Sequence, residues 1–421
     1  MTTLHDLRAE LDAHAGDVVD TGAAPRTIAV HERVRVIRRR RRSVATTAAV
    51  LALVAGGAGV TVLTQDRDHA SVADRTLVGQ VAPEHLTSLG FGYTFVTAAE
   101  GEGEARLSLD ASDEPRLVTW AGAGDGAVTV TTGADETTST SDFGDFLPVY
   151  EGADWQVTVT GEGRVAVAVY DLSELADGVT QDGVVFRRDV AGDQLLDAAF
   201  GDGNEPVSFT VPMPEGALRV TEVCRGAPKG AELEIEVAGI GRMWTECKNG
   251  WSVDAGLGGG TLGKLGMPEP GTPVTIRTRL TQGHDGPVIT PDGVDFGVGA
   301  YAVDTPAAAG WGSGVSRLVE ADGHLWRFVS LTDGRPEGGS FTATSPTEGP
   351  RWVELHFSRV QQDAIVRGLI QGQESSPYFG GGGTGSAGLG LAEPGSRVTI
   401  RVQGDPGSRA RVALAFYERV D

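Results

Sequence analysis

Few residues of this 421-residue chain have the types and spacing that catalysis or phosphate binding requires. The run Gly258–Leu265 reads GGGTLGKL, close to the phosphate-binding loop of nucleotide hydrolases. That loop needs a Ser or Thr after its lysine to bind magnesium, and Leu265 stands there instead. It also needs a helix after it, whereas the surrounding pattern is that of strands. We therefore interpret the run as a flexible loop equivalent to Gly380–Gly383; a ligand-binding rim is the alternative.

Other sequence signatures of catalysis or metal binding are absent or incomplete. Neither GxSxG nor HExxH occurs. The run Asp202-Gly203-Asn204-Glu205 begins like a calcium-binding loop, but its twelfth position is Met213 rather than Glu. A calcium site built from several loops and a pair of catalytic carboxylates both stay open. We expect no catalytic, cofactor or metal site, and surface positions for the scattered histidines His69, His85, His284, His324 and His356.

The aromatic residues suggest a binding role instead. Trp244, Trp251, Trp311, Trp326 and Tyr378 lie in or near expected loops. Exposed tryptophans in β-sandwich proteins can stack on sugar rings, because the indole face is large and apolar. We take Trp244, Trp251 and Trp326 as candidate ligand-contacting residues. The alternative is that they fill the edge of a core.

The only two cysteines, Cys224 and Cys247, each follow an expected strand. There is no CxxC motif and no histidine close to either in the sequence. We predict a disulfide, which requires an oxidising compartment. Closing this loop stabilises the fold by about 3 kcal/mol in the chain-entropy description.

The elements that position these residues are predicted to be strands. Glycine (61 residues) and proline (20) are abundant, and the chain is rich in Val and Thr. The segment Gly266–Arg277 repeats as Gly390–Arg401 at a constant offset of 124 residues. Each copy leads to a closing strand, at Val298–Tyr301 and Leu414–Tyr417, and Val167–Tyr170 is a third. Such internal similarity predicts tandem modules.

Each module is predicted to be a β-sandwich, because Val and Ile alternate with Thr and Arg after a Pro-Gly turn. The fold class is mainly β: three tandem, jelly-roll-like sandwiches after one N-terminal transmembrane helix. The expected modules are residues 81–175, 183–304 and 315–421, with linkers at 171–182 and 303–314. Residues 65–80 are expected to link the first module to the helix.

A membrane span is predicted for residues 44–64, which carry no charge. At ~1.5 Å per residue a helix of this length spans about 30 Å, the thickness of the hydrocarbon layer. Arg38, Arg39, Arg40, Arg41 and Arg42 precede it, which places residues 1–43 in the cytoplasm and the modules outside. A cleaved export signal and a buried core helix are the alternatives.

The N-terminal pattern resembles that of a known group of proteins. Leu7-Arg8-Ala9-Glu10-Leu11, an Arg-rich run and an Ala/Val helix resemble actinobacterial single-pass membrane-anchored proteins of unknown role. Some of these resemble anti-sigma-type regulators in layout, which implies a cytoplasmic partner for residues 1–43. The resemblance covers residues 1–65. The zinc-binding type of tail needs two cysteines, and this tail has none.

Charge limits the partners. Residues 1–43 hold nine arginines against six acidic residues, net +3, and lipid headgroups are the alternative partner for them. The remainder holds 26 basic and 51 acidic residues, net −25, so we expect no nucleic-acid binding there. The leading hypothesis is a binding or structural role at the cell surface, with a cell-wall polysaccharide or a surface protein as ligand. Transmembrane signalling is the alternative.

Overall fold

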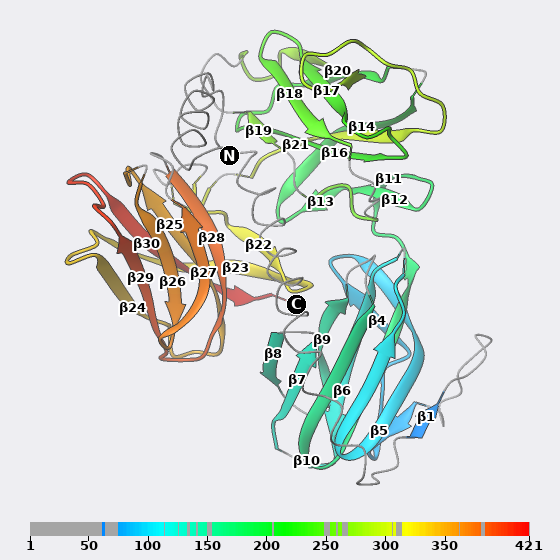
Figure 1. The fold of residues 1–421 in the computed structure, drawn as a ribbon, viewed down its shortest axis with the longest axis vertical. Helices are drawn as coiled ribbons and strands as arrows, with labels where there is room; N and C mark the ends of the chain where they lie inside the picture. The colour runs from blue at the N-terminus through cyan, green and yellow to red at the C-terminus, as the bar shows by residue number, and fades with distance from the viewer. Residues whose placement is uncertain are drawn as a thin grey trace, which may run out of the picture. The chain divides into compact units, whose positions relative to one another are not determined.

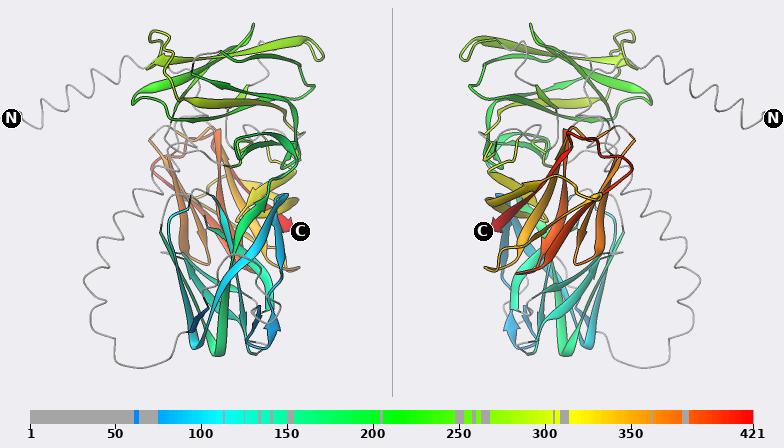
Figure 2. Two further views of the ribbon diagram at one scale, coloured as in Figure 1. Left: turned by 90° about the vertical axis from the view of Figure 1, so that its right-hand side faces the viewer. Right: turned by 90° about the vertical axis from the view of Figure 1, so that its left-hand side faces the viewer.

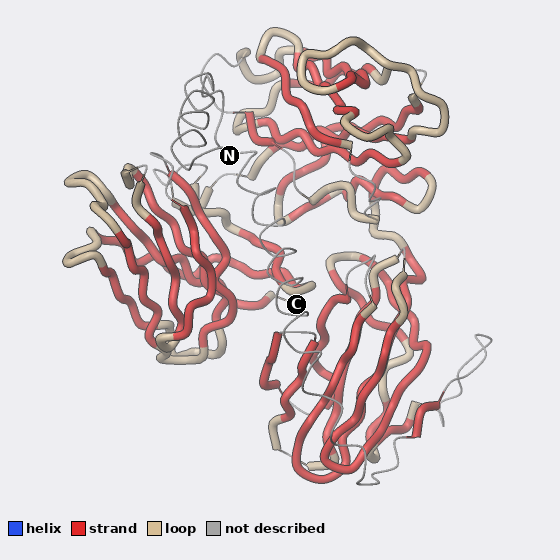
Figure 3. The backbone as a smooth tube through the Cα atoms, viewed as in Figure 1, coloured by secondary structure: helices blue, strands red, loops and turns tan. Residues whose placement is uncertain are grey.

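The computed structural model describes residues 61–63, 75–112, 114–124, 126–132, 135–139, 142–149, 154–203, 206–247, 253–257, 260–262, 268–304, 306–308, 314–361, 363–379 and 384–420. In these ranges the chain forms strands and loops, so the mainly-β prediction is confirmed (Figure 3). No helix within them is long and apolar enough to cross a bilayer. Residues 1–43 with Arg38–Arg42, and Trp251, lie outside the described residues.

The end of the predicted membrane helix requires a correction. Thr61–Leu63 form strand β1 and pair antiparallel with Ala98–Glu100 of β5. Two of the three residues, Thr61 and Val62, are β-branched and fit a pleated strand better than a helix. The helix prediction is therefore wrong at these three positions, and the rest of the span lies outside the described residues.

The first large sheet is built around two long strands (Figures 1 and 2). Its order is β1-β5-β10-β6-β9; β4 pairs with β5, β7 with β10 and β8 with β7. β5 has 19 residues and β10 has 20, so different parts of β10 pair with β6 and β7. The strands are β4 (His85–Ser88), β5 (Phe91–Leu109), β6 (Arg116–Gly122), β7 (Val128–Thr132), β8 (Asp135–Ser139), β9 (Asp142–Val149) and β10 (Trp155–Glu174).

Two further sheets form from residues 189–302 (Figure 1). The five-stranded sheet has the order β13 (Asp189–Val190), β14 (Asp193–Asp202), β21 (Asp295–Ala302), β16 (Leu218–Arg225) and β19 (Gly260–Leu262). The four-stranded sheet has the order β15 (Ser208–Pro212), β20 (Pro273–Gln282), β17 (Ala231–Val237) and β18 (Gly241–Glu246).

Residues 318–419 repeat both orders. The five-stranded sheet is β22 (Leu318–Ala321), β23 (His324–Gly334), β30 (Arg411–Arg419), β25 (Arg351–Ser358) and β28 (Thr384–Ala392). The four-stranded sheet is β24 (Ser340–Thr344), β29 (Arg397–Gln403), β26 (Ile365–Ile370) and β27 (Gln373–Phe379). β20 and β29 are the segments that the offset of 124 residues relates. The path β5-β10-β6-β9 of the first sheet follows the same order as β14-β21-β16-β19 and β23-β30-β25-β28.

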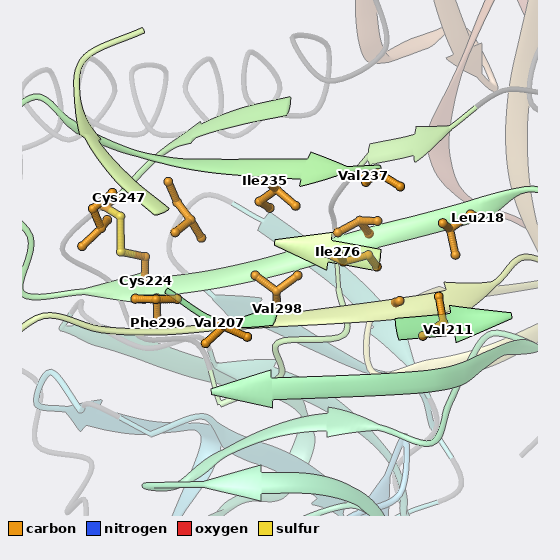
Figure 4. Close-up of a cluster of buried hydrophobic side chains, with 14 of the residues drawn as sticks. Val207, Val211, Leu218, Cys224, Ile235, Val237, Cys247, Ile276, Phe296 and Val298 are labelled. Carbon is orange, nitrogen blue, oxygen red and sulfur yellow. A yellow bond between two sulfur atoms is a disulfide. The ribbon is translucent and has the colours of Figure 1, made fainter. Parts of the chain in front are cut away.

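The core of residues 206–302 lies between its two sheets (Figure 4). Ile235 and Val237 of β17 and Ile276 of β20 face Leu218 of β16 and Val298 of β21, each at most 1 % exposed. The predicted disulfide is confirmed between Cys224, in β16, and Cys247, directly after β18. It therefore joins the five-stranded sheet to the four-stranded sheet at one end of the core.

A buried tyrosine marks the central strand of each five-strand path. Tyr170 of β10, Tyr301 of β21 and Tyr417 of β30 are each 0 % exposed. Burial raises the pKa of all three phenols, so they stay neutral. Their hydroxyls donate to Pro83 O (2.9 Å), Arg187 O (3.0 Å) and Glu354 Oε2 (3.0 Å) respectively.

Strands, not a linker, occupy most of residues 171–182: β10 continues to Glu174, and a β-hairpin begins at Gly178. β11 (Gly178–Gln181) pairs with β12 (Val184–Arg187) through the turn Asp182-Gly183, whose φ values are +50° and +80°. Two consecutive positive φ values define the type I′ turn, for which Asp-Gly is a favoured pair. Phe186 of this hairpin is fully buried and its ring covers Gly297 and Gly299 of β21. A shorter pair, β2 (Thr76–Leu77) and β3 (Gln80–Val81), precedes the first large sheet.

Arg187, at the end of β12, bonds to three segments that lie far apart in the sequence. Its guanidinium donates to Asp254 (2.8 Å), to both oxygens of Glu320 in β22 (2.9 and 2.5 Å) and to Leu89 O (3.4 Å). The Arg187 side chain is 4 % exposed, and those of Asp254 and Glu320 are 11 % and 7 %. Burial by itself lowers the pKa of Arg187, but the two carboxylates reverse this and keep it charged.

Candidate binding site

The outward face of the four-stranded sheet β15-β20-β17-β18 gathers aromatic and charged side chains. In β17, Leu233, Ile235 and Val237 point into the core, so Glu232, Glu234 and Glu236 point outward. By the same alternation β20 presents Arg277 and Arg279, and β18 presents Arg242 and Trp244. This face is positioned by a core that the disulfide closes at one end.

One register row of this face runs through three strands. Glu234 of β17 lies directly opposite Arg279 of β20 on one side and Trp244 of β18 on the other. Arg279 holds Glu234 with two hydrogen bonds of 2.8 Å, Nε to Oε2 and Nη2 to Oε1. Arg242 approaches the same carboxylate at 3.4 Å. The Glu234 side chain projects from the outward face of the sheet. It is nevertheless only 2 % exposed, because neighbouring side chains cover it.

Trp244 forms an aromatic ledge with His284. The two ring centroids are 4.2 Å apart at an interplanar angle of 51°. His284 follows β20, its side chain is 62 % exposed, and its ring nitrogens lie 3.8 Å from Glu232 and 3.6 Å from Asp285. The indole Nε1 of Trp244 is buried and has no hydrogen-bond partner in the described part of the chain. We call Trp244, His284, Glu234, Arg279 and Arg242 the Trp244 ledge.

This arrangement suits binding rather than catalysis. Aromatic rings offer an apolar platform for a sugar ring, and the fixed guanidinium groups donate hydrogen bonds to hydroxyl oxygens. Glu234 is held by two arginines, so it does not act as a free base. Nor does any group of three His, Cys, Asp or Glu side chains among the described residues have the arrangement of a metal site.

The structure distinguishes two of the tryptophans that the sequence offers as ligand-contacting candidates. Trp244 lies in the ledge. Trp326 is 4 % exposed, its Nε1 donates to Ala321 O at 3.1 Å, and its ring lies 6.3 Å from that of Trp352. Trp326 therefore fills core, as the alternative interpretation held, and is not a ligand-contacting residue. Trp251 remains an untested candidate, because it lies outside the described ranges.

The surface assignment of the histidines is also wrong in part. His324 and His356 are 4 % and 1 % exposed. His324 lies against the Phe146 ring at 4.2 Å, and His356 lies 3.5 Å from Glu354. In strand β25, His356 alternates with core residues and points to the other face of the sheet, where neighbouring side chains cover it.

The expectations from sequence do not include the charged residues of the ledge, Glu234, Arg279 and Arg242. The segment Ala231–Val237, AELEIEV, alternates strictly and so contains the signal that three glutamates share one face. The pairing of Glu234 with Arg279 joins residues 45 positions apart. Strand register between distant segments is not encoded by local alternation, so the row itself could not be read from the sequence.

No family model matches the chain, and no curated protein matches it. Among solved structures, the chain is similar to the M60 catalytic domain with the CBM51-1 and CBM51-2 domains of Clostridium perfringens ZmpB, at 9 % identity and a TM-score of 0.18. The match covers 86 % of this chain and 38 % of that one. The ANX1 ectodomain of Arabidopsis thaliana matches at 11 % identity and a TM-score of 0.18, over 87 % and 89 % of the two chains. Similarity at these TM-scores carries no argument about fold or function.

Proposed function

We propose that the chain is a single-pass, membrane-anchored protein whose extracytoplasmic β-modules bind a cell-surface polysaccharide at the Trp244 ledge. The observation that carries this proposal is the row Arg279–Glu234–Trp244, in which an ion pair fixes polar donors beside an aromatic platform. Sugar-binding sites need both features close together, because a pyranose has an apolar face and a polar rim.

The proposed topology rests on charge and on the disulfide. Five arginines precede an uncharged run, which marks the cytoplasmic side of a span. Since β1 begins at Thr61, the span comprises residues 44–60, a length of 17 residues that is within the range for a transmembrane helix. The Cys224–Cys247 disulfide is of the kind that persists outside the cytoplasm. Protease added to intact cells should digest the modules. A chain that is fully protected from the protease would contradict this topology.

The module count extends the same proposal. Three tandem, jelly-roll-like sandwiches would comprise residues 75–174, 178–302 and 318–419, each ending in the strand that contains the buried tyrosine. The shared strand order of the five-strand paths supports this division. The second module then begins at the β11–β12 hairpin, five residues before the start expected from the sequence.

The binding test uses the full-length chain in detergent micelles and affinity electrophoresis through gels that contain mannan, arabinogalactan or dextran. We expect at least one of these neutral polymers to retard the chain. Trp244→Ala and His284→Ala should each weaken that retardation about tenfold or more, the effect of losing ~1.4 kcal/mol of binding free energy. Leu391→Ala, at a 42 % exposed position on β28, is the control and should bind as wild type. Unchanged binding by both ledge variants would remove the proposal.

A further inference from the structure

Two carboxylates lie directly opposite each other at the rim of the Trp244 ledge. In the register of β17 and β18, Glu232 pairs with Glu246, two residues along from the pairing of Glu234 with Trp244. Both side chains project from the outward face of the sheet, because they share the alternation of Glu234 and Trp244. We call Glu232 and Glu246 the carboxylate pair.

The pairing of like charges is an exception on this face. Opposite charges facing each other across two strands stabilise a sheet, and like charges destabilise it. In the neighbouring rows, Glu234 lies opposite Arg279. Glu236 lies between Arg242 of β18 and Arg277 of β20. The carboxylate pair departs from this rule, so the sheet itself gains no stability from the arrangement.

The charge of the carboxylate pair is not balanced by an arginine or lysine. Glu246 is exposed and forms no ion pair with any residue that the structure describes. The side chain of Glu232 is 26 % exposed, and the His284 ring lies 3.8 Å from its carboxylate. Both arginines of the ledge are engaged by Glu234. The rim therefore presents negative charge beside an aromatic surface.

The carboxylate pair lies within reach of a ligand that covers the indole. Glu246 is two residues from Trp244 on one face of β18, a separation of about 7 Å. His284 connects Trp244 to Glu232, since its ring contacts the indole at a centroid distance of 4.2 Å and lies 3.8 Å from the carboxylate. A sugar ring on Trp244 therefore places its substituents next to both carboxylates.

This surrounding chemistry selects a sugar that carries an amine. An ammonium group donates up to three hydrogen bonds, forms charge-assisted hydrogen bonds with carboxylates, and is attracted to the face of an indole by the cation–π interaction. We propose that the Trp244 ledge binds a polysaccharide of amino sugars with free amines, and that Glu232 and Glu246 hold the ammonium between them. This inference rests on the proposed function, because it assigns the ligand class of the same site.

The charge of the whole chain acts in the same direction. Residues 44–421 carry a net charge of −25, which attracts a cationic polymer and repels an acidic one. A neutral sugar can stack on Trp244 but makes no use of the carboxylate pair. We therefore expect neutral polysaccharides to bind more weakly than those with free amines.

The experiment measures the affinity of the full-length chain in detergent micelles for two oligosaccharides. One is a glucosamine oligomer and the other is its fully N-acetylated counterpart of the same length, both at about pH 6, where free amines carry charge. Wild-type chain should bind the glucosamine oligomer about tenfold more tightly or better, and this difference should shrink as salt is raised. Trp244→Ala should weaken the binding of both oligomers.

Isosteric substitutions isolate the contribution of the two carboxylates. Glu232→Gln and Glu246→Gln should each weaken binding of the glucosamine oligomer about tenfold and leave binding of the N-acetylated oligomer unchanged. The melting temperature of Glu246→Gln should equal or exceed that of wild type, because a like-charge contact is removed. Glu162→Gln makes the same change of charge at an exposed position on β10 and should bind both oligomers as wild type does.

The outcomes separate this inference from the proposed function. The inference is overturned if wild-type chain binds the glucosamine oligomer no more tightly than the N-acetylated one, or if Glu162→Gln weakens binding as much as Glu246→Gln. In either case, loss of N-acetylated oligomer binding in Trp244→Ala would still support sugar binding at the ledge. Binding of both oligomers that Trp244→Ala leaves unchanged would overturn the inference and the proposed function together.

Discussion

Arg187 and Glu320 lie 133 residues apart in the chain and form a two-hydrogen-bond ion pair that is almost sealed from solvent. Glu320 also accepts the backbone N–H of Ala191 at 3.0 Å. The pair thus links the end of β12 and the β13–β14 turn to strand β22. Ser88 Oγ also donates to Gly323 O at 2.6 Å, which links the end of β4 to the β22–β23 turn.

Breaking this pair should destabilise the folded chain strongly. Arg187→Met leaves Asp254 and Glu320 buried without their cation, which is expected to cost about 3–5 kcal/mol. The adjacent Arg188 is a matched control, because its ion pair with Asp177 is exposed, at 70 % and 75 % for the two side chains. Arg188→Met should leave stability almost unchanged, because an exposed ion pair is screened by solvent. Urea unfolding of both variants measures the contrast; equal stabilities would show that the Arg187 ion pairs are not needed.

The pH dependence of stability should carry a contribution from Asp254. Burial raises the pKa of Asp254 above its ordinary value, even though Arg187 opposes the shift. A carboxyl whose pKa is higher in the folded state contributes stability that is present below the unfolded pKa, about 3.9, and is lost as pH rises through the folded pKa. Relative to Asp254→Asn, wild type should therefore lose stability as pH rises above ~4. Unfolding measured from pH 4 to 7 tests this; a stability difference that stays constant would contradict it.

The covering of β21 by the β11–β12 hairpin should be sensitive to a single methyl group. A Cβ at residue 299 would meet Phe186 Cδ1 at 2.5 Å, inside van der Waals contact. Gly299→Ala is therefore expected to cost about 1–3 kcal/mol through overpacking. Gly241→Ala, in β18, has no atom within 4 Å of the new Cβ and should be close to neutral. Thermal unfolding compares the two variants. Equal melting temperatures would contradict the prediction, because they would show that the Phe186 ring moves aside without loss of stability.

The prediction of the fold from sequence succeeded where local patterns decide the outcome. Alternation within Pro273–Gln282 and Arg397–Gln403 predicted half-buried strands, and the cysteine count predicted the disulfide. The Asp182-Gly183 pair is a turn signal, yet the high Asp and Gly content of residues 171–182 predicts a linker. The burial of Phe186 on Gly299 depends on which hairpin covers which sheet, and that is a non-local choice.

The candidate site was predictable to a smaller degree. Trp244 could be selected as an aromatic near a loop, but so could Trp326, which packs in the core. The two tryptophans differ in the position of their strands. Trp244 lies in β18, an edge strand, whereas Trp326 lies in β23, which pairs with β22 on one side and β30 on the other.

The most direct measurement of the central claim is hydroxyl-radical footprinting of the full-length chain with and without the neutral polysaccharide that it binds. Bound sugar covers the ledge, so oxidation of Trp244 and His284 should fall several-fold, while oxidation of the exposed Leu391 stays unchanged. If Trp244 and His284 are oxidised at the same rate in the presence of saturating polysaccharide, the ledge is not the binding site.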